Sequence, residues 1–85
     1  MKIVPFTGVI RAASPDGRTG IVALDRPYNG ELEFAVISSD TKGRVQLMNG
    51  KGRLVKDTRV KGQATVGSQS LVAIMVEPER EHEHA

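Results

Sequence analysis

The sequence predicts an all-β fold, a small five-stranded antiparallel barrel with an extra β-hairpin between its third and fourth strands. Valine, isoleucine and leucine dominate the apolar residues, whereas aromatic residues make up only 4% of the chain. β-Branched residues pack well on a pleated sheet, so this composition favours strands. Runs of alternating apolar and polar residues recur between turn signals, and no helical period persists beyond a turn or two. The chain of 85 residues has room for one domain, which we expect to span residues 1–76.

The first two expected strands are each followed by a turn. Residues 3–13 form the first strand, and residues 14–17 read Ser-Pro-Asp-Gly. In this turn proline presets φ, aspartate bonds to its own downstream backbone and glycine tolerates a positive φ. The second strand covers residues 19–24 and ends at residues 25–30, where a proline removes a ladder donor and an Asn-Gly pair favours a reversal.

The third expected strand, residues 31–37, has apolar residues at every second position. Successive side chains of a strand point to opposite faces, so this pattern indicates a half-buried strand. The face expected to be buried holds Leu32, Phe34 and Val36. The face expected to lie outside holds Glu31, Glu33 and Ala35.

The fourth and fifth strands are expected at residues 59–66 and 71–76. In the fourth, the residues predicted to face inward are Val60, Gly62, Ala64 and Val66. Small inward residues suit the taper of a tight barrel. Arg59, Lys61, Gln63 and Thr65 are then expected outside. The fifth strand is apolar on both faces, which is typical of a strand covered on its second side by a loop or a partner.

The connection between the third and fourth strands, residues 38–58, is too long to lack structure in a compact domain. Residues 44–48 and 51–55 flank Asn49-Gly50, and Asn-Gly is a strong signal for a two-residue hairpin turn. We therefore expect a β-hairpin in this connection.

The charge of the chain is divided between its body and its end. Residues 1–76 hold eleven lysines or arginines and six acidic residues, whereas residues 77–85 hold one and four. The short end also contains a proline and no apolar anchor, so we expect a flexible acidic tail at residues 77–85. The basic body is compatible with a polyanionic partner.

Several classes of protein are disfavoured. No run of about 18 apolar residues and no signal-peptide pattern occur, so we expect a cytoplasmic protein without a membrane partner. The chain has no cysteine, which excludes disulfides and thiolate metal sites. His82 and His84 lie in the expected tail, which offers no rigid tetrahedral site. The aspartates fall at turns and loop ends, and no serine has a neighbouring base. We expect neither catalysis, nor a bound metal, nor a cofactor.

Several segments carry a resemblance to a known family. Residues 8–14, Gly-Val-Ile-Arg-Ala-Ala-Ser, and residues 17–22, Gly-Arg-Thr-Gly-Ile-Val, have the length and spacing of the first two strands of a cold-shock domain. Residues 34–39 resemble the second ribonucleoprotein motif of that family, and residues 52–62 resemble its entry into the fourth strand. The resemblance implies an oligonucleotide-binding (OB) type of barrel that binds single-stranded nucleic acid. An SH3-like or S1-like barrel fits the same strand pattern.

The residues that stack bases in the cold-shock family are largely replaced. Ala12, Ala13, Thr19 and Ile21 stand where that family has aromatic residues, and Arg18 replaces a glycine. Stacking is worth about 1–3 kcal/mol per base, so the loss of three or four platforms removes about 4 kcal/mol, or roughly a thousandfold in affinity. Any binding of nucleic acid is therefore expected to depend on contacts with the charged backbone.

Basic residues form the predicted nucleic-acid-binding set. Two Lys-Gly-Arg triplets, at residues 42–44 and 51–53, would lie near each other across the expected hairpin. The whole set comprises Arg11, Arg18, Lys42, Arg44, Lys51, Arg53, Arg59 and Lys61. These residues predict weak, salt-dependent binding of RNA or single-stranded DNA. The alternative interpretation is a solvated hairpin that its charges keep soluble.

A second hypothesis is a protein-interaction or self-association module. Its expected partner face comprises Ala12, Ala13, Thr19, Ile21 and Tyr28, with Ala35 beside them. An exposed apolar patch usually marks an interface, and the partner would be another protein or a second copy of this chain. Tyr28 also fits a simpler role as a cover for the barrel end. A ligand inside the barrel is disfavoured, because side chains fill so small a barrel.

Overall fold

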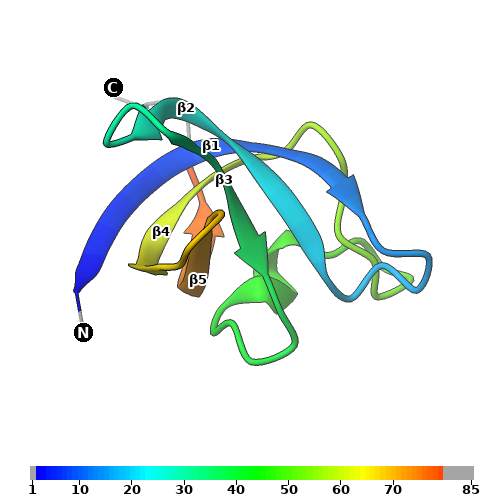
Figure 1. Ribbon diagram of the computed structural model, residues 1–85. Coiled ribbons are helices and arrows are strands. Elements are labelled where there is room, and N and C mark those ends of the chain that lie inside the picture. Colours follow the sequence, from blue (N-terminus) through cyan, green and yellow to red (C-terminus); the bar gives the residue numbers. More distant parts are fainter. Residues whose placement is uncertain (1, 80–85) are drawn as a thin grey trace, which may run out of the picture.

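The computed structural model describes residues 2–79 and confirms the all-β prediction (Figure 1). Its elements are β1 (Ile3–Ala13), β2 (Gly20–Tyr28), β3 (Leu32–Ile37), the 3₁₀ turn η1 (Arg44–Leu47), β4 (Arg59–Val66) and β5 (Leu71–Pro78). In the described part of the chain, no helix is long and apolar enough to cross a membrane.

The five strands form one closed sheet in the order β1-β2-β3-β5-β4. Strand β1 pairs with both β2 and β4, and the β2–β3 and β4–β5 pairs are also antiparallel. Strands β3 and β5 run parallel, through the pairs Ala35↔Leu71 and Val36↔Val72. The sheet is therefore mixed, and the expectation of a fully antiparallel barrel is wrong at this seam. The reason is that β4 comes between β3 and β5 in the sequence. The chain therefore reverses direction twice before β5 pairs with β3, and the two strands run the same way.

The core lies inside the ring of strands and is almost entirely aliphatic. Its buried side chains are Val4, Phe6, Ile10, Val22, Ala35, Ile37, Leu47, Leu54, Val60, Ala64, Leu71, Ala73 and Val76. The inward face predicted for β4 is confirmed at Val60, Gly62 and Ala64. Val66 is exposed instead, because it is the last residue of β4 and lies beyond the packed interior.

The predicted burial of β3 is wrong by one residue. Ala35 and Ile37 are completely buried, whereas Phe34 is 38% exposed. Ala35 lies opposite Val22, which itself lies opposite Ile10, and all three are buried. A tight barrel accommodates the small alanine at this point and leaves the larger phenylalanine outside. A shift of one residue exchanges the two faces of a strand, and this exchange affects residues 34–37. At the start of the strand, Leu32 packs against the core and Glu33 is exposed, as predicted.

The expected hairpin in residues 38–58 does not form. Instead the chain makes the turn η1, followed by a single bridge between Met48 and Leu54. The side-chain oxygen of Asn49 accepts hydrogen bonds from the backbone N–H groups of Lys51 and Arg53, at 2.8 and 3.2 Å. These local bonds replace a strand ladder. The segment still reverses at Asn49, and it buries Leu47 and Leu54 against the core.

Strand β5 extends beyond the expected end of the domain at residue 76. Pro78 lies opposite Val60, and Glu77 lies opposite Lys61. The backbone N–H of Glu79 donates to the carbonyl of Arg59 at 3.0 Å. Residues 77–79 are therefore held by the sheet, because β4 offers them pairing partners. The rest of the expected tail, with His82 and His84, lies outside the described residues.

Candidate nucleic-acid interface

The β1–β2 loop and the segment after η1 pack together at one end of the barrel (Figure 1). The backbone N–H of Leu54 donates to the carbonyl of Gly17 at 2.9 Å. The guanidinium of Arg53 donates to the carbonyl of Pro15 at 3.0 Å. The guanidinium of Arg44 donates to the carbonyl of Arg18 at 2.8 Å. These hydrogen bonds join segments that are far apart in the sequence. They bring three of the predicted basic residues to the same end of the barrel: Arg18, Arg44 and Arg53.

The β1–β2 loop is held in shape by its own side chains. The hydroxyl of Ser14 donates to the Asp16 carboxylate at 2.6 Å, and the backbone N–H of Arg18 donates to the same oxygen at 3.0 Å. The Ser14 hydrogen bond, followed by that from Arg18, lowers the pKa of Asp16. Gly17 has a φ of 75°, and a Cβ at this position would lie 2.5 Å from Cγ of Arg53. The turn residues predicted from the sequence therefore leave room for the Arg53 side chain against Gly17.

The basic residues at this end keep their charge available. Arg44 and Arg53 donate to backbone carbonyls, which are neutral groups. Within residues 2–79, the ion pairs of the predicted basic set involve Arg59 and Lys61 alone. Arg18 and Lys51 are exposed. The Asp16 carboxylate in the β1–β2 loop offsets part of the charge of Arg18. The remaining cations attract phosphate groups over distances comparable to the Debye length.

Two other predicted cations are engaged by carboxylates. Arg59 forms ion pairs of 2.6 Å with Asp25 and 2.8 Å with Glu79. The hydrogen bonds that Arg59 donates to the Asp25 and Glu79 carboxylates raise its pKa. Lys61 lies 3.9 Å from Glu77. These positions are already compensated, so they fit a phosphate contact less well than the loop end does.

Lys42 is exposed and is held beside β5. Its backbone N–H donates to the carbonyl of Ile74 at 2.9 Å, and its carbonyl accepts from the N–H of Val76 at 2.8 Å. Gly43 follows with a φ of 84°, and a Cβ at that position would lie 2.1 Å from the carbonyl oxygen of Val76. Lys42 is therefore fixed to the sheet rather than carried on a projecting hairpin.

The Asp25–Arg59 pair leads to a prediction about pH. The hydrogen bonds from Arg59 and then Thr7 lower the pKa of Asp25 below its ordinary value of 3.8. A carboxylate with a depressed pKa in the folded state stabilises the fold above the ordinary pKa, and this contribution is lost as the pH falls through the depressed pKa. We expect Asp25→Asn to lower the free energy of unfolding at neutral pH, and the difference from the native chain to shrink below pH 3.8. Urea unfolding at several pH values measures it.

The matched control for this pH prediction is Asp40→Asn. Asp40 is also exposed, and within residues 2–79 its carboxylate makes no ion pair or side-chain hydrogen bond. Its substitution should leave the same small difference at every pH. A difference for Asp25→Asn that stays constant across the acid range would contradict the assigned role of the Arg59 pair.

The outer face of β2 and β3 carries two rows of apolar side chains. One row consists of Val9, Ala23 and Phe34, which lie opposite one another on β1, β2 and β3. The neighbouring row consists of Ala12, Ile21, Val36 and Val72. Ile21 is 40% exposed and Val72 is 39% exposed. Arg11 is the extra residue of a bulge between Ile10 and Ala12, and it is exposed at the border of the two rows.

The structure places only part of the expected partner face together. Ala12, Ala13 and Ile21 are exposed near the β1–β2 loop, and Thr19 is half-buried there. Tyr28 lies opposite Leu32 and packs against the core, so it does not share that surface. Ala35, which the sequence pattern placed outside, is buried.

Residues that the sequence interpretation missed enlarge this outer face. Phe34, Val36 and Val72 were assigned to the core or left without a role, although all three contribute to the outer rows. The available signal was that β5 is apolar on both faces, which requires one of its faces to be outside the core.

Comparisons with protein-family models, curated proteins and solved structures found no match to this chain.

Proposed function

We propose that this domain is a non-enzymatic, OB-type barrel that binds single-stranded nucleic acid, RNA above all. The strand order β1-β2-β3-β5-β4 with a parallel β3–β5 seam supports this assignment. OB barrels are five-stranded, and they bind oligonucleotides on the face of strands 2 and 3 and on the adjoining loops. The observation that carries the proposal is the exposure of Phe34 on that face, combined with the group of basic side chains at the β1–β2 loop end of the same barrel.

In the proposed surface, binding comes from cationic side chains and from one aromatic ring. Arg11, Arg18, Arg44, Lys51 and Arg53 would contact the phosphates. Phe34 would stack one base, which is worth about 1–3 kcal/mol. Neutralising about five phosphates of a single strand implies a salt slope near −3.5, because each contact contributes about −0.7. The proposal thus keeps the predicted reliance on backbone charge and adds one stacking position.

The test is a fluorescence anisotropy titration with a labelled single-stranded RNA of about 12 nucleotides, a length that fits one OB barrel. Between about 50 mM and 200 mM salt, we expect the affinity to fall roughly a hundredfold. The double variant Arg18→Gln/Lys51→Gln removes two charges whose side chains make no hydrogen bond or ion pair within the described residues. It should weaken binding and lower the salt slope by about 1.4.

Arg26→Gln is the matched control, because Arg26 is exposed at the other end of β2 and has no ion pair within residues 2–79. RNA binding by this variant should equal that of the native chain. Affinity that is insensitive to salt, or an equal loss for Arg26→Gln and the double variant, would contradict the proposed surface.

The second candidate function is protein interaction or self-association through the apolar rows. The observation that favours it is the continuity of Ile21, Val36 and Val72 across three strands. Exposed apolar patches of this kind often mark interfaces. Sedimentation equilibrium distinguishes the two functions, since self-association makes the mass depend on concentration and Val72→Lys should abolish that dependence. A strict monomer that retains no partner protein would exclude this candidate.

A further inference from the structure

The wall of the barrel has a gap between β1 and β2, at the end away from the β1–β2 loop. The β1–β2 ladder begins at the pair Gly8↔Leu24, so residues 3–7 of β1 pair with β4 alone. Strand β2 also loses its register with β3 between Ala23 and Tyr28. The two strands therefore diverge from Gly8 and Leu24 onward, without a ladder between them.

Two prolines flank this gap, and they keep it from closing as a sheet. Pro5 lies on β1 and Pro27 lies on β2. Proline has no N–H to donate, and within sheets it is confined to edges and bulges. Within residues 2–79, a hydrogen bond of 2.7 Å from the Thr7 hydroxyl to the Asp25 carboxylate links the two strands across the gap. Across the gap the two strands are thus linked by side chains and not by a backbone ladder.

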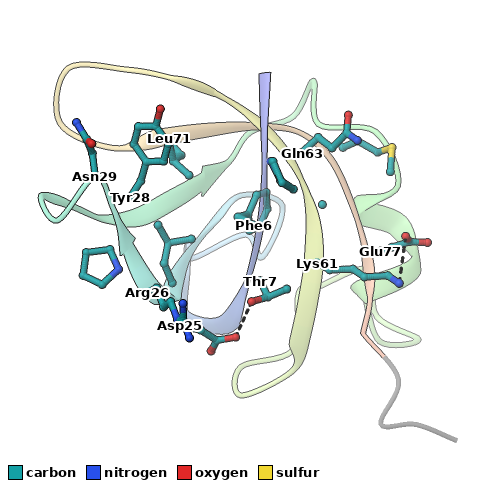
Figure 2. Close-up of a pocket in the computed structure, with 15 residues that line it drawn as sticks. Phe6, Thr7, Asp25, Arg26, Tyr28, Asn29, Lys61, Gln63, Leu71 and Glu77 are labelled. Carbon is teal, nitrogen blue, oxygen red and sulfur yellow. Dashed lines mark hydrogen bonds and ion pairs between the residues drawn. The ribbon is translucent and has the colours of Figure 1, made fainter. Parts of the chain in front are cut away.

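A pocket of about 790 Å³ occupies the gap and the adjoining outer surface of β4 and β5 (Figure 2). Its deepest lining residues are Phe6 and Leu71, which belong to the core. Leu24 and Tyr28 form its apolar wall on the side of β2. Small-molecule sites typically measure about 300–1,000 Å³ and combine apolar walls with a few polar groups. This pocket has the same size and composition.

The charged residues of the pocket indicate the sign of a ligand. The Asp25 carboxylate is engaged by Thr7 and Arg59. Lys61 and Glu77 face each other at 3.9 Å. Among the described residues, Arg26 is the charged lining group that has neither an ion pair nor a side-chain hydrogen bond. A ligand with one negative charge would compensate it, and arginine binds carboxylates through two parallel hydrogen bonds.

We propose that this pocket binds a small aromatic carboxylate of one or two rings. The ring lies against Leu24, above the buried side chains of Phe6 and Leu71, and the carboxylate pairs with Arg26. Tyr28 borders the ring from the side of β2. This inference is independent of nucleic-acid binding, because none of the lining residues belongs to the surface proposed for RNA. Lys61, a basic candidate from the sequence, faces Glu77 instead.

The test is a titration of the full chain with three probes: 2-naphthoate, the neutral 2-naphthalenemethanol and acetate. Binding is detected from shifts of the amide and tyrosine-ring NMR signals. Tyr28 is the single tyrosine, so its ring signals are assigned without ambiguity and report directly on the pocket. We expect 2-naphthoate to bind with a dissociation constant of roughly 1 mM or below, with shifts around Phe6, Leu24 and Tyr28. The neutral alcohol should bind about tenfold more weakly, since a charged hydrogen bond is worth about 1.5–3 kcal/mol, and acetate should not bind.

Variants distinguish a specific binding site from nonspecific hydrophobic binding. Arg26→Gln should weaken 2-naphthoate by about tenfold, which corresponds to one charged hydrogen bond, and Arg26→Lys should restore part of the affinity. Arg18→Gln, at the opposite end of the barrel, should leave it unchanged. Equal binding of the acid and the alcohol, shifts confined to the outer face of β2 and β3, or the absence of saturable shifts would each overturn the proposal. None of these outcomes bears on the RNA titration, so the two proposals fail separately.

Discussion

Gly62→Ala is expected to destabilise the domain by about 3 kcal/mol or more. A Cβ at Gly62 would lie 2.0 Å from the carbonyl oxygen of Met75 and 3.0 Å from Cα of Val76. Both are backbone atoms of β5, so no side chain can rotate to make room. Overpacking of a core typically costs about 1–3 kcal/mol, and a clash with a paired strand reaches at least the upper end of that range. Small domains have about 5–15 kcal/mol in total, so a loss of about 3 kcal/mol or more leaves this one marginal.

Urea unfolding followed by circular dichroism measures the effect, and Gly50→Ala is its matched control. No atom lies within 4 Å of a Cβ built at Gly50, and its φ is not positive. The control should therefore unfold at nearly the same urea concentration as the native chain. If both variants have the native midpoint, β4 and β5 do not approach each other as described.

Phe34→Ala is expected to weaken RNA binding by about 5-fold to 150-fold and to leave the fold almost as stable as before. The affinity estimate follows from about 1–3 kcal/mol for one stacked base. The small effect on stability follows from the position of Phe34 on the outer face, opposite Ala23. RNA anisotropy and urea unfolding are to be measured on the same preparation.

Phe6→Ala provides an unusually direct control, because Phe6 and Phe34 are the two phenylalanines of the chain. Phe6 is 6% exposed and belongs to the core. Its removal should cost about 3–5 kcal/mol of stability, as for other buried phenylalanines. Large destabilisation by Phe34→Ala would contradict the placement of Phe34 on the outer face of β3. Unchanged RNA affinity in a folded Phe34→Ala chain would remove stacking from the proposed function.

Sequence patterning predicts the five strands well, because alternation and turn residues are local signals. The ends of β1 and β4 agree with the expected ranges, and Ser-Pro-Asp-Gly does make the β1–β2 turn. The face of β3 is not predictable in the same way. Leu32, Phe34 and Val36 form a regular apolar row, yet only the pairing of Ala35 with Val22 decides which row faces the interior. That decision depends on the diameter of the barrel, which no single strand encodes.

The candidate site is predictable in its residue types but not in its assembly. The sequence identifies Arg44 and Arg53 from the two Lys-Gly-Arg triplets, and Arg18 as an extension of the same basic patch. The proximity of these three side chains depends on two hydrogen bonds between segments distant in the sequence. Arg44 donates to the carbonyl of Arg18, and Arg53 donates to the carbonyl of Pro15. The capture of Arg59 by Asp25 and Glu79 is likewise a tertiary event. Charge counts indicate which side chains are available, and the fold determines which of them remain uncompensated.

The pairing of β1 with β4 has a consequence for how the chain folds. Ile3 lies opposite Thr65, and β5, which completes the ring, ends at Pro78. Within this domain, β1 is therefore synthesised more than 40 residues before β4, its second neighbour. Folds dominated by such distant pairings have high contact order and fold in about milliseconds to seconds. During that interval the aliphatic strands are exposed, and Pro5, within β1, reduces the capacity of this strand to pair with another chain.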